Sequence, residues 1–160
     1  MSPDLRLRPG TVADLPVVAE VQLRARRAAV PAMPALVHPD RDVRAHVGAT
    51  DLETHELWVA EVDAGICGYV LLTDTWLDDL YVDPASQGQG IGSALLDLAR
   101  ALRPTGFDLW VFASNTPARA FYRSHGLREV EKTDGSGNEE GAPDVRVHWP
   151  GERSRRRVVD

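Results

Sequence analysis

The sequence predicts an α/β domain with a mixed central sheet flanked by about four helices. The first reason is the order of strand-like and helix-like runs, β-α-α-β-β-β-α-β-α-β-β. The second is a helical crossover after three strand runs, which implies a locally parallel pair behind an antiparallel first half. The length of 160 residues, 43% of them hydrophobic, suits one domain over 1–150. We expect the basic tail over 151–160 to be disordered.

The N-terminal part predicts one strand and two helices. Leucines alternate with arginines over residues 5–9, which is typical of a half-buried strand. A helix with apolar residues at helical spacing follows. Only the first turn of a helix tolerates proline, so Pro16 favours Asp14 as the N-cap. The proline-rich segment 30–39 ends this helix, and a second helix is predicted over 40–48.

Three strand runs follow, and the first two form a predicted hairpin. Segments 56–62 and 66–74 are rich in β-formers and are joined by "DAG", which is a turn signal. The third run, "WLDDLYVDP", ends at a proline. Strand alternation divides its side chains between two faces, with Asp78, Leu80 and Val82 on one and Asp79 and Tyr81 on the other.

A glycine-rich turn then opens a helix of about residues 90–102. The predicted buried face of this helix carries Ala94, Leu95, Leu98 and Leu102. The next run, "FDLWVFAS", has the apolar, β-forming composition of a buried strand. These two elements supply the predicted parallel crossover.

A short helix and two strands complete the predicted fold. Thr116 is the expected N-cap of the helix, Pro117 its first residue, and Gly126 lies just past its end. Strands are predicted over 127–133 and 145–149. The polar, glycine-rich sequence between them predicts a loop.

Composition limits the classes of partner. The net charge of −6 argues against nucleic acid or an anionic membrane. The single cysteine, Cys67, fits a reducing compartment, and no histidine or cysteine has metal-ligand spacing. No apolar run approaches a membrane span, and the N-terminus lacks a signal-peptide core. We therefore expect a cytoplasmic protein without a metal centre.

The stretch "QGQGIGS" places three glycines where a helix is about to start. Gly88, Gly90 and Gly92 would let backbone N–H groups approach an anion at the positive end of the helix dipole. A P-loop is excluded because the stretch has no lysine, and the dinucleotide fingerprint is excluded because Ser93 stands where it needs glycine. A glycine-rich turn without a ligand remains the alternative.

Two motifs together resemble the GCN5-related N-acetyltransferases. Gln87, Gly90 and Gly92 fill the family pattern Arg/Gln-x-x-Gly-x-Gly/Ala, which lies between a strand and a helix. Asn115 and Tyr122 occur at the family's spacing in "SNTPARAFYRSHGL". The resemblance extends from about Leu5 to Trp149 in element order. It implies a sheet with a splayed parallel pair of strands at the binding site of its cofactor, acetyl-CoA.

The resemblance also implies which residues bind the cofactor. Backbone N–H groups of about Gln89 to Ser93 would hold the pyrophosphate, and backbone groups of Leu80 and Val82 would pair with pantetheine. The full set of expected cofactor-binding residues is Leu80, Tyr81, Val82, Gln87, Gly88, Gln89, Gly90, Ile91, Gly92, Ser93 and Asn115.

Acyl transfer to an amine needs a proton acceptor and a donor for the leaving thiolate. By resemblance, Tyr122 is the donor, Asp78 the base, and Asp79 a residue that binds the amine. His38 lies in the segment that walls the family's acceptor site and is a further substrate-binding candidate. The structural alternatives are a core aromatic for Tyr122, a turn or cap for Asn115 and solvated carboxylates for the two acids.

The resemblance therefore predicts direct transfer of an acetyl group from acetyl-CoA to a primary amine of a small molecule, through a ternary complex. Acetylation of a protein N-terminus, a lysine or a charged tRNA is an alternative, as is an acyl-CoA sensor without turnover. A homodimer is possible, since dimers are common in the family.

Overall fold

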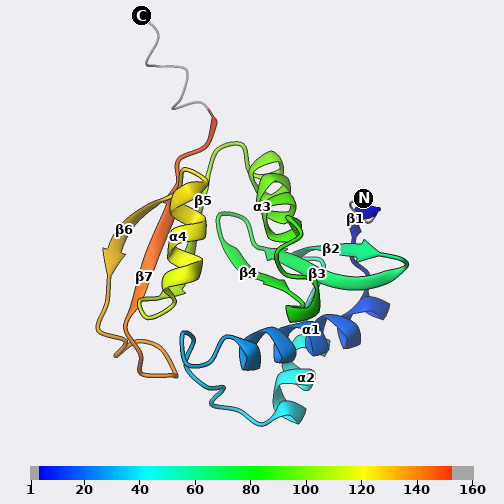
Figure 1. Ribbon diagram of the computed structural model, residues 1–160, viewed down its shortest axis with the longest axis horizontal. Coiled ribbons are helices and arrows are strands. Elements are labelled where there is room, and N and C mark those ends of the chain that lie inside the picture. Colours follow the sequence, from blue (N-terminus) through cyan, green and yellow to red (C-terminus); the bar gives the residue numbers. More distant parts are fainter. Residues whose placement is uncertain (1–3, 153–160) are drawn as a thin grey trace, which may run out of the picture.

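The computed structural model describes residues 4–152, and its elements follow the predicted order (Figure 1). In chain order they are β1 (Leu5–Pro9), the 3-10 helix η1 (Val12–Asp14), α1 (Leu15–Ala28), α2 (Asp40–Gly48), β2 (Glu56–Val62), β3 (Gly65–Leu72), β4 (Leu77–Val82), the 3-10 helix η2 (Pro84–Ser86), α3 (Ile91–Leu102), β5 (Phe107–Phe112), α4 (Thr116–Ser124), β6 (Arg128–Lys132) and β7 (Asp144–Trp149). The mixed α/β class and its four α-helices are confirmed.

The strands form two antiparallel sheets that meet at one point. The first has the order β1-β2-β3-β4 and the second β5-β7-β6. An isolated parallel bridge joins Trp76 to Asp108, and Asp108 N–H donates to Thr75 O (3.0 Å). Within residues 4–152, this bridge is the whole of the β-pairing between the two sheets, and β4 and β5 form no ladder. The two strands therefore diverge beyond the bridge (Figure 1).

Two hydrophobic clusters hold the layers together. One lies between α1, α2 and the first sheet and includes Leu23, Val59 and Tyr69. The other joins α3 and α4 to both sheets and includes Leu95 and Phe107. Helices thus cover both faces of the first sheet, and the gap between β4 and β5 lies where the two clusters meet.

The buried face of α3 differs from the predicted one. Ile91, Leu95 and Ala99 are buried along with Leu96, whereas the predicted Ala94 and Leu98 are only half-buried. Gly68 of β3 explains why α3 turns this face, rather than the predicted one, toward the sheet. A Cβ atom there would lie 3.3 Å from a Leu95 methyl and 3.4 Å from an Ile91 methyl. Because glycine has no Cβ atom, the Leu95 and Ile91 side chains can pack against the sheet.

The sequence predicts that β5 is a buried strand, but only one of its faces is buried. Phe107, Leu109 and Val111 are buried, but Trp110 is 45% exposed. The physical reason is that α4 lies across only one face of the second sheet (Figure 1). The strand therefore alternates in the way typical of a sheet with one open face.

The predicted start of α1 is confirmed in position, and the predicted cap of α4 is corrected. Asp14 directly precedes α1, but it has helical dihedral angles and makes no side-chain cap hydrogen bond. Its carboxylate instead pairs with Arg8 (2.8 Å) and accepts a hydrogen bond from Thr11 N–H (2.8 Å). The predicted cap Thr116 is wrong, because Asn115 precedes the first turn of α4 and accepts a hydrogen bond from Ala118 N–H (3.3 Å). Asn115 has non-helical dihedral angles, as a cap requires.

Residues just past the predicted domain boundary at 150 still contact the loop before β5. Gly151 is buried, and Glu152 N–H donates to Pro104 O (3.1 Å). From residue 153 onward, the predicted basic tail lies outside the described residues. Among residues 4–152, no helix combines the length and apolar character that a bilayer span requires.

Candidate active site

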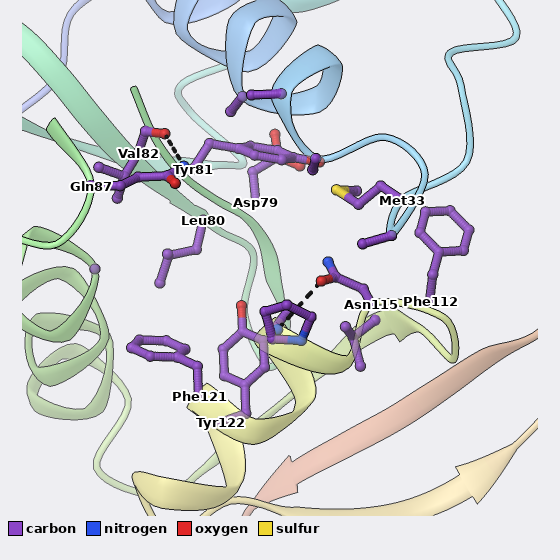
Figure 2. Close-up of a pocket in the computed structure, with 18 of the residues that line it drawn as sticks. Met33, Asp79, Leu80, Tyr81, Val82, Gln87, Phe112, Asn115, Phe121 and Tyr122 are labelled. Carbon is purple, nitrogen blue, oxygen red and sulfur yellow. Dashed lines mark hydrogen bonds between the residues drawn. The ribbon is translucent and has the colours of Figure 1, made fainter. Parts of the chain in front are cut away.

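A cavity of about 860 Å³ occupies the gap between β4 and β5 (Figure 2). Its walls come from β4, the glycine loop with the first turn of α3, β5, α4 and the segment that leaves the end of α1. This volume lies in the range of small-molecule sites. Because the two sheets separate only past the Trp76–Asp108 bridge, the topology itself creates the space.

The glycine loop forms one end of the cavity and has the geometry of an anion site. Gly88 and Gly90 both have φ of 80°, a conformation that other residues rarely adopt. A Cβ atom at either position would meet nothing within 4 Å, so the loop borders open space. Gly90 is the N-cap residue of α3, whose first-turn N–H groups have no partners within the helix. These groups and the helix dipole fit a diphosphate.

The edge of β4 that faces the cavity is free to pair with an extended ligand. Asp83 N–H donates to Cys67 O on β3 (2.7 Å), so alternation turns the backbone groups of Leu80 and Val82 away from β3. The Val82 carbonyl accepts a hydrogen bond from Gln87 Nε2 (3.2 Å) instead. A thread-like ligand could therefore add to this edge as a short strand would.

Tyr122 enters the cavity from α4 with its hydroxyl directed toward β4 (Figure 2). Its ring packs edge-on against Phe121, with centroids 5.2 Å apart. Burial raises the pKa of the hydroxyl well above its usual value, and the nearby Tyr81 and Asp79 add to the shift. Tyr122 is consequently neutral at physiological pH and carries a proton that it can donate.

A β-bulge separates the two candidate carboxylates. Leu71 pairs with Asp79, but Leu72 pairs with Leu77, so Asp78 is the extra residue of β4. Strict alternation through Asp78 is therefore a wrong prediction, because the bulge interrupts the two-residue period. Asp78 is an exposed residue, yet both carboxylates line the cavity.

Burial changes the acidity of both groups. The Tyr69 hydroxyl donates to Asp79 Oδ2 (3.2 Å), but desolvation still raises the pKa of Asp79 to about 6. Partial desolvation also raises the pKa of Asp78, against the opposing effect of a hydrogen bond with Thr73. Asp79 therefore changes charge close to neutral pH, where a group that binds or deprotonates an amine is useful.

A buried arginine lies behind the acceptor side of the cavity, and sequence reasoning missed it. Arg26 is 7% exposed, and its Nη2 donates to Pro34 O (3.3 Å) and lies 3.6 Å from Glu140. The guanidinium carbon lies 5.8 Å from the centre of the Phe112 ring. Its Nε has no hydrogen-bond partner among the described residues. Arg26 thus connects α1, the proline-rich segment, the end of β5 and the loop before β7.

The cavity collects most of the predicted site residues. Those that line it are Asp78, Asp79, Leu80, Tyr81, Val82, Gln87, Gly88, Gly90, Ile91, Gly92, Ser93, Asn115 and Tyr122. Gln89 lies outside the lining. His38 does too, and its Nε2 pairs with Glu139 (2.8 Å) in an exposed position. Asn115 lines the cavity and also caps α4, so its structural and binding interpretations are compatible.

Several residues that line the cavity were not predicted from the sequence. Met33 reaches the cavity from the proline-rich segment, and Trp110 and Phe112 reach it from β5. Only the alternation of β5 could have indicated the last two. Residues 4–152 contain no cluster of three or more histidine, cysteine or acidic side chains arranged to hold a metal ion.

Comparison with known proteins finds a family model that matches part of the chain. Residues 53–129 match the family model of the acetyltransferase (GNAT) domain. The chain is 38% identical over 79 residues to the peptidyl-lysine N-acetyltransferase YjaB of Salmonella typhimurium, which covers 49% of this chain and 54% of that protein. The chain therefore spans about half the length of this relative.

Solved structures agree in fold. The solution structure of apo YjaB from Escherichia coli superposes with a TM-score of 0.75 at 20% identity, covering 93% of this chain and 99% of that one. The PaiA N-acetyltransferase of Thermoplasma acidophilum, solved in complex with coenzyme A, gives a TM-score of 0.70 at 19% identity, covering 92% and 99%.

Proposed function

We propose that the chain is a member of the GNAT acetyltransferase family, whose domain model matches residues 53–129, and that it transfers an acetyl group from acetyl-CoA to the primary amine of a small molecule, directly within a ternary complex. One observation carries the proposal. A single cavity joins the glycine loop, the free edge of β4, the Tyr122 hydroxyl and two carboxylates. An anion site, an extended channel, a proton donor and acidic groups are the parts that this reaction needs.

The glycine loop and β4 would hold the cofactor, which supplies the acetyl thioester when bound. The first-turn N–H groups of α3, from Ile91 to Ser93, bind the pyrophosphate. Backbone groups of Leu80 and Val82 pair with the pantetheine chain, and Asn115 contacts the same chain from the start of α4. Open space at Gly88 and Gly90 supports this assignment, since nothing of the protein lies within 4 Å of a Cβ built there.

The proton steps belong to Tyr122 and the two carboxylates. Tyr122 donates its Oη proton where negative charge develops on the leaving sulfur, and its raised pKa keeps that proton in place at neutral pH. Ionised Asp79 binds the acceptor as an ammonium ion. Asp78 then accepts the amine proton, with a water relay because aspartate is short.

A panel of primary amines tests this function. Free thiol released from acetyl-CoA is measured with the wild-type protein and with Tyr122→Phe. Amine-dependent release that falls in the variant supports the proposal. CoA binding without release, for any amine tried, would make the protein an acyl-CoA sensor and overturn the transfer reaction.

Acetylation of a lysine side chain is the second candidate function. It is favoured by the name of the 38%-identical relative, a peptidyl-lysine N-acetyltransferase. A lysine peptide and its free-amine counterpart, compared by kcat/KM in the same assay, distinguish the two candidates.

A further inference from the structure

The acceptor side of the cavity carries an aromatic surface that the proposed chemistry does not use. The indole rings of Trp76 and Trp110 stack, with centroids 6.2 Å apart and an interplanar angle of 10°. Trp110 is 45% exposed and lines the cavity. An exposed tryptophan on a rigid strand at a cavity wall is more informative than a scattered apolar surface residue. The free part of this flat surface is available to a ligand.

The backbone register places this surface beside a carboxylate. Trp76 is bridged to Asp108 in parallel, and Asp78 and Trp110 each lie two residues further along their strands. Paired strands lie roughly 5 Å apart. Asp78 and Trp110 both line the cavity just past this bridge, where the gap between the strands begins.

The charge of the cavity wall selects a cation. Its charged lining residues are Asp78, Asp79 and Asp144, with no lysine, arginine or histidine. The Asp144 carboxylate is already engaged, since it accepts hydrogen bonds from the Thr133 hydroxyl and from Asn138 Nδ2 (3.3 Å). Two carboxylates remain for an ammonium group.

The arginine beside Trp110 on the second sheet is committed to other partners. Arg146 is the cross-strand neighbour of Trp110. Its guanidinium pairs with Asp108 (2.8 Å) and Glu131 (2.8 Å). These ion pairs fix Arg146 within the second sheet, so a ligand on Trp110 would meet an indole surface rather than a free cation.

The cavity wall continues past Trp110 with a second aromatic ring and a thioether. Phe112 lies two residues beyond Trp110 on β5, and Met33 faces it from the proline-rich segment (Figure 2). The Ser114 hydroxyl donates to Ala32 O (2.6 Å) and ties that segment to the end of β5. Aromatic rings and a thioether pack well against a flat ring.

We propose that Trp110, stacked on Trp76, is a specificity-determining residue that binds the planar ring of an arylalkylamine acceptor while its ammonium group lies between Asp78 and Asp79. The inference rests on the proposed acetyl transfer and names its substrate class. It distinguishes this class from two others that the acidic wall alone would admit, namely aliphatic diamines and lysine side chains.

Two amines of nearly equal size provide the test. 2-Phenylethylamine has a flat ring, whereas 2-cyclohexylethylamine has a puckered one. We expect the wild-type protein to favour the phenyl compound by at least about fivefold in kcat/KM, because ring stacking adds to apolar burial. Trp110→Leu should reduce this ratio to near one, and Trp110→Phe should keep most of it. Val130→Ala, at an exposed position on β6, is the control that leaves the ratio unchanged.

Other outcomes overturn the inference. Equal use of the two amines by the wild type would do so, as would a preference for 1,5-diaminopentane or a lysine peptide, or an unchanged ratio in Trp110→Leu. If no amine releases thiol, the transfer function fails. Calorimetry with 2-phenylethylamine in the presence of CoA then decides the subsite separately: binding by the wild type that Trp110→Leu weakens about tenfold supports it, and equal or absent binding refutes it.

Discussion

The two ends of the cavity are built in different ways. At the proposed cofactor end, residues 87–93 form one continuous glycine loop with the geometry of an anion site, and Gly88 and Gly90 both have φ of 80°. At the acceptor end, Met33, Asp79, Trp110 and Asp144 come from four separate segments. Ion pairs and hydrogen bonds, such as Arg26–Glu140 and Ser114–Ala32, hold those segments together.

This difference indicates which end of the cavity can change its ligand specificity by substitution. A backbone site depends on local conformation and tolerates change elsewhere in the chain. An acceptor wall assembled from loops changes its surface with single side chains while the sheets stay as they are. Substitutions at the two ends should therefore affect different kinetic constants, and each prediction below tests that separation.

The largest effect is expected at the cofactor end. Gly92→Glu should weaken CoA binding by on the order of 10³-fold, because like charges about 4 Å apart repel by roughly 4 kcal/mol at an effective dielectric constant of 20. A Cβ at Gly92 makes only ordinary contacts of 3.7 Å or more, so the fold should persist. Calorimetry with CoA measures the change.

Gly92→Gln is the matched control, since it has the same size without the charge. Its CoA affinity should stay far closer to wild type than that of the glutamate variant. Similar losses in both would show that bulk, rather than anion recognition, governs the loop. CoA should also raise the melting temperature of the wild type, because it binds the folded state.

Tyr122 lies where the two ends meet. Tyr122→Phe should lower kcat by about 10²–10³, by analogy with the loss of an oxyanion-hole donor. The ring and its packing on Phe121 remain, so CoA affinity should change only a few-fold. Single-turnover kinetics and CoA titration measure the two quantities. If Tyr122→Phe turned over at the wild-type rate under conditions where chemistry is rate-limiting, Tyr122 would have only a packing role.

The carboxylates test the acceptor end alone. Asp79→Asn should raise KM for the amine, about tenfold, more than it lowers kcat, because it removes binding in ground and transition states alike. Asp78→Asn should mainly lower kcat and steepen its dependence on pH above neutrality, where free amine forms unaided. Neither should alter CoA affinity. Negligible effects of both changes would leave the pair as solvated surface.

The smallest effect is on stability and follows from the pKa of Asp79. Its folded-state value of about 6 lies above the ordinary 3.8, so the folded protein carries a penalty that is absent below about pH 4 and complete above about pH 6. Asp79→Asn should raise the unfolding free energy at pH 8, on the order of 1 kcal/mol, and leave it unchanged at pH 4. Thermal melts at both values measure this, and equal shifts would contradict it.

Sequence patterns predicted the local parts of this molecule well. Helix α2 has the predicted bounds, Asp14 directly precedes α1, and the glycine loop precedes α3. The errors have local causes as well. Asn115 took the capping role from Thr116 because its side chain reaches Ala118 N–H. The bulge moved Asp78 out of alternation because one extra residue shifts the pairing by one position.

The sequence by itself determined the element order and the glycine loop before α3, because each depends on a few consecutive residues and their backbone angles. Only the tertiary structure decided which side chains face the acceptor. Trp110 meets Trp76 because the two sheets join at a single bridge, and Arg26 meets Glu140 although 114 positions separate them in the numbering. Such meetings depend on how the sheets and loops pack, and no periodicity within one segment encodes that packing.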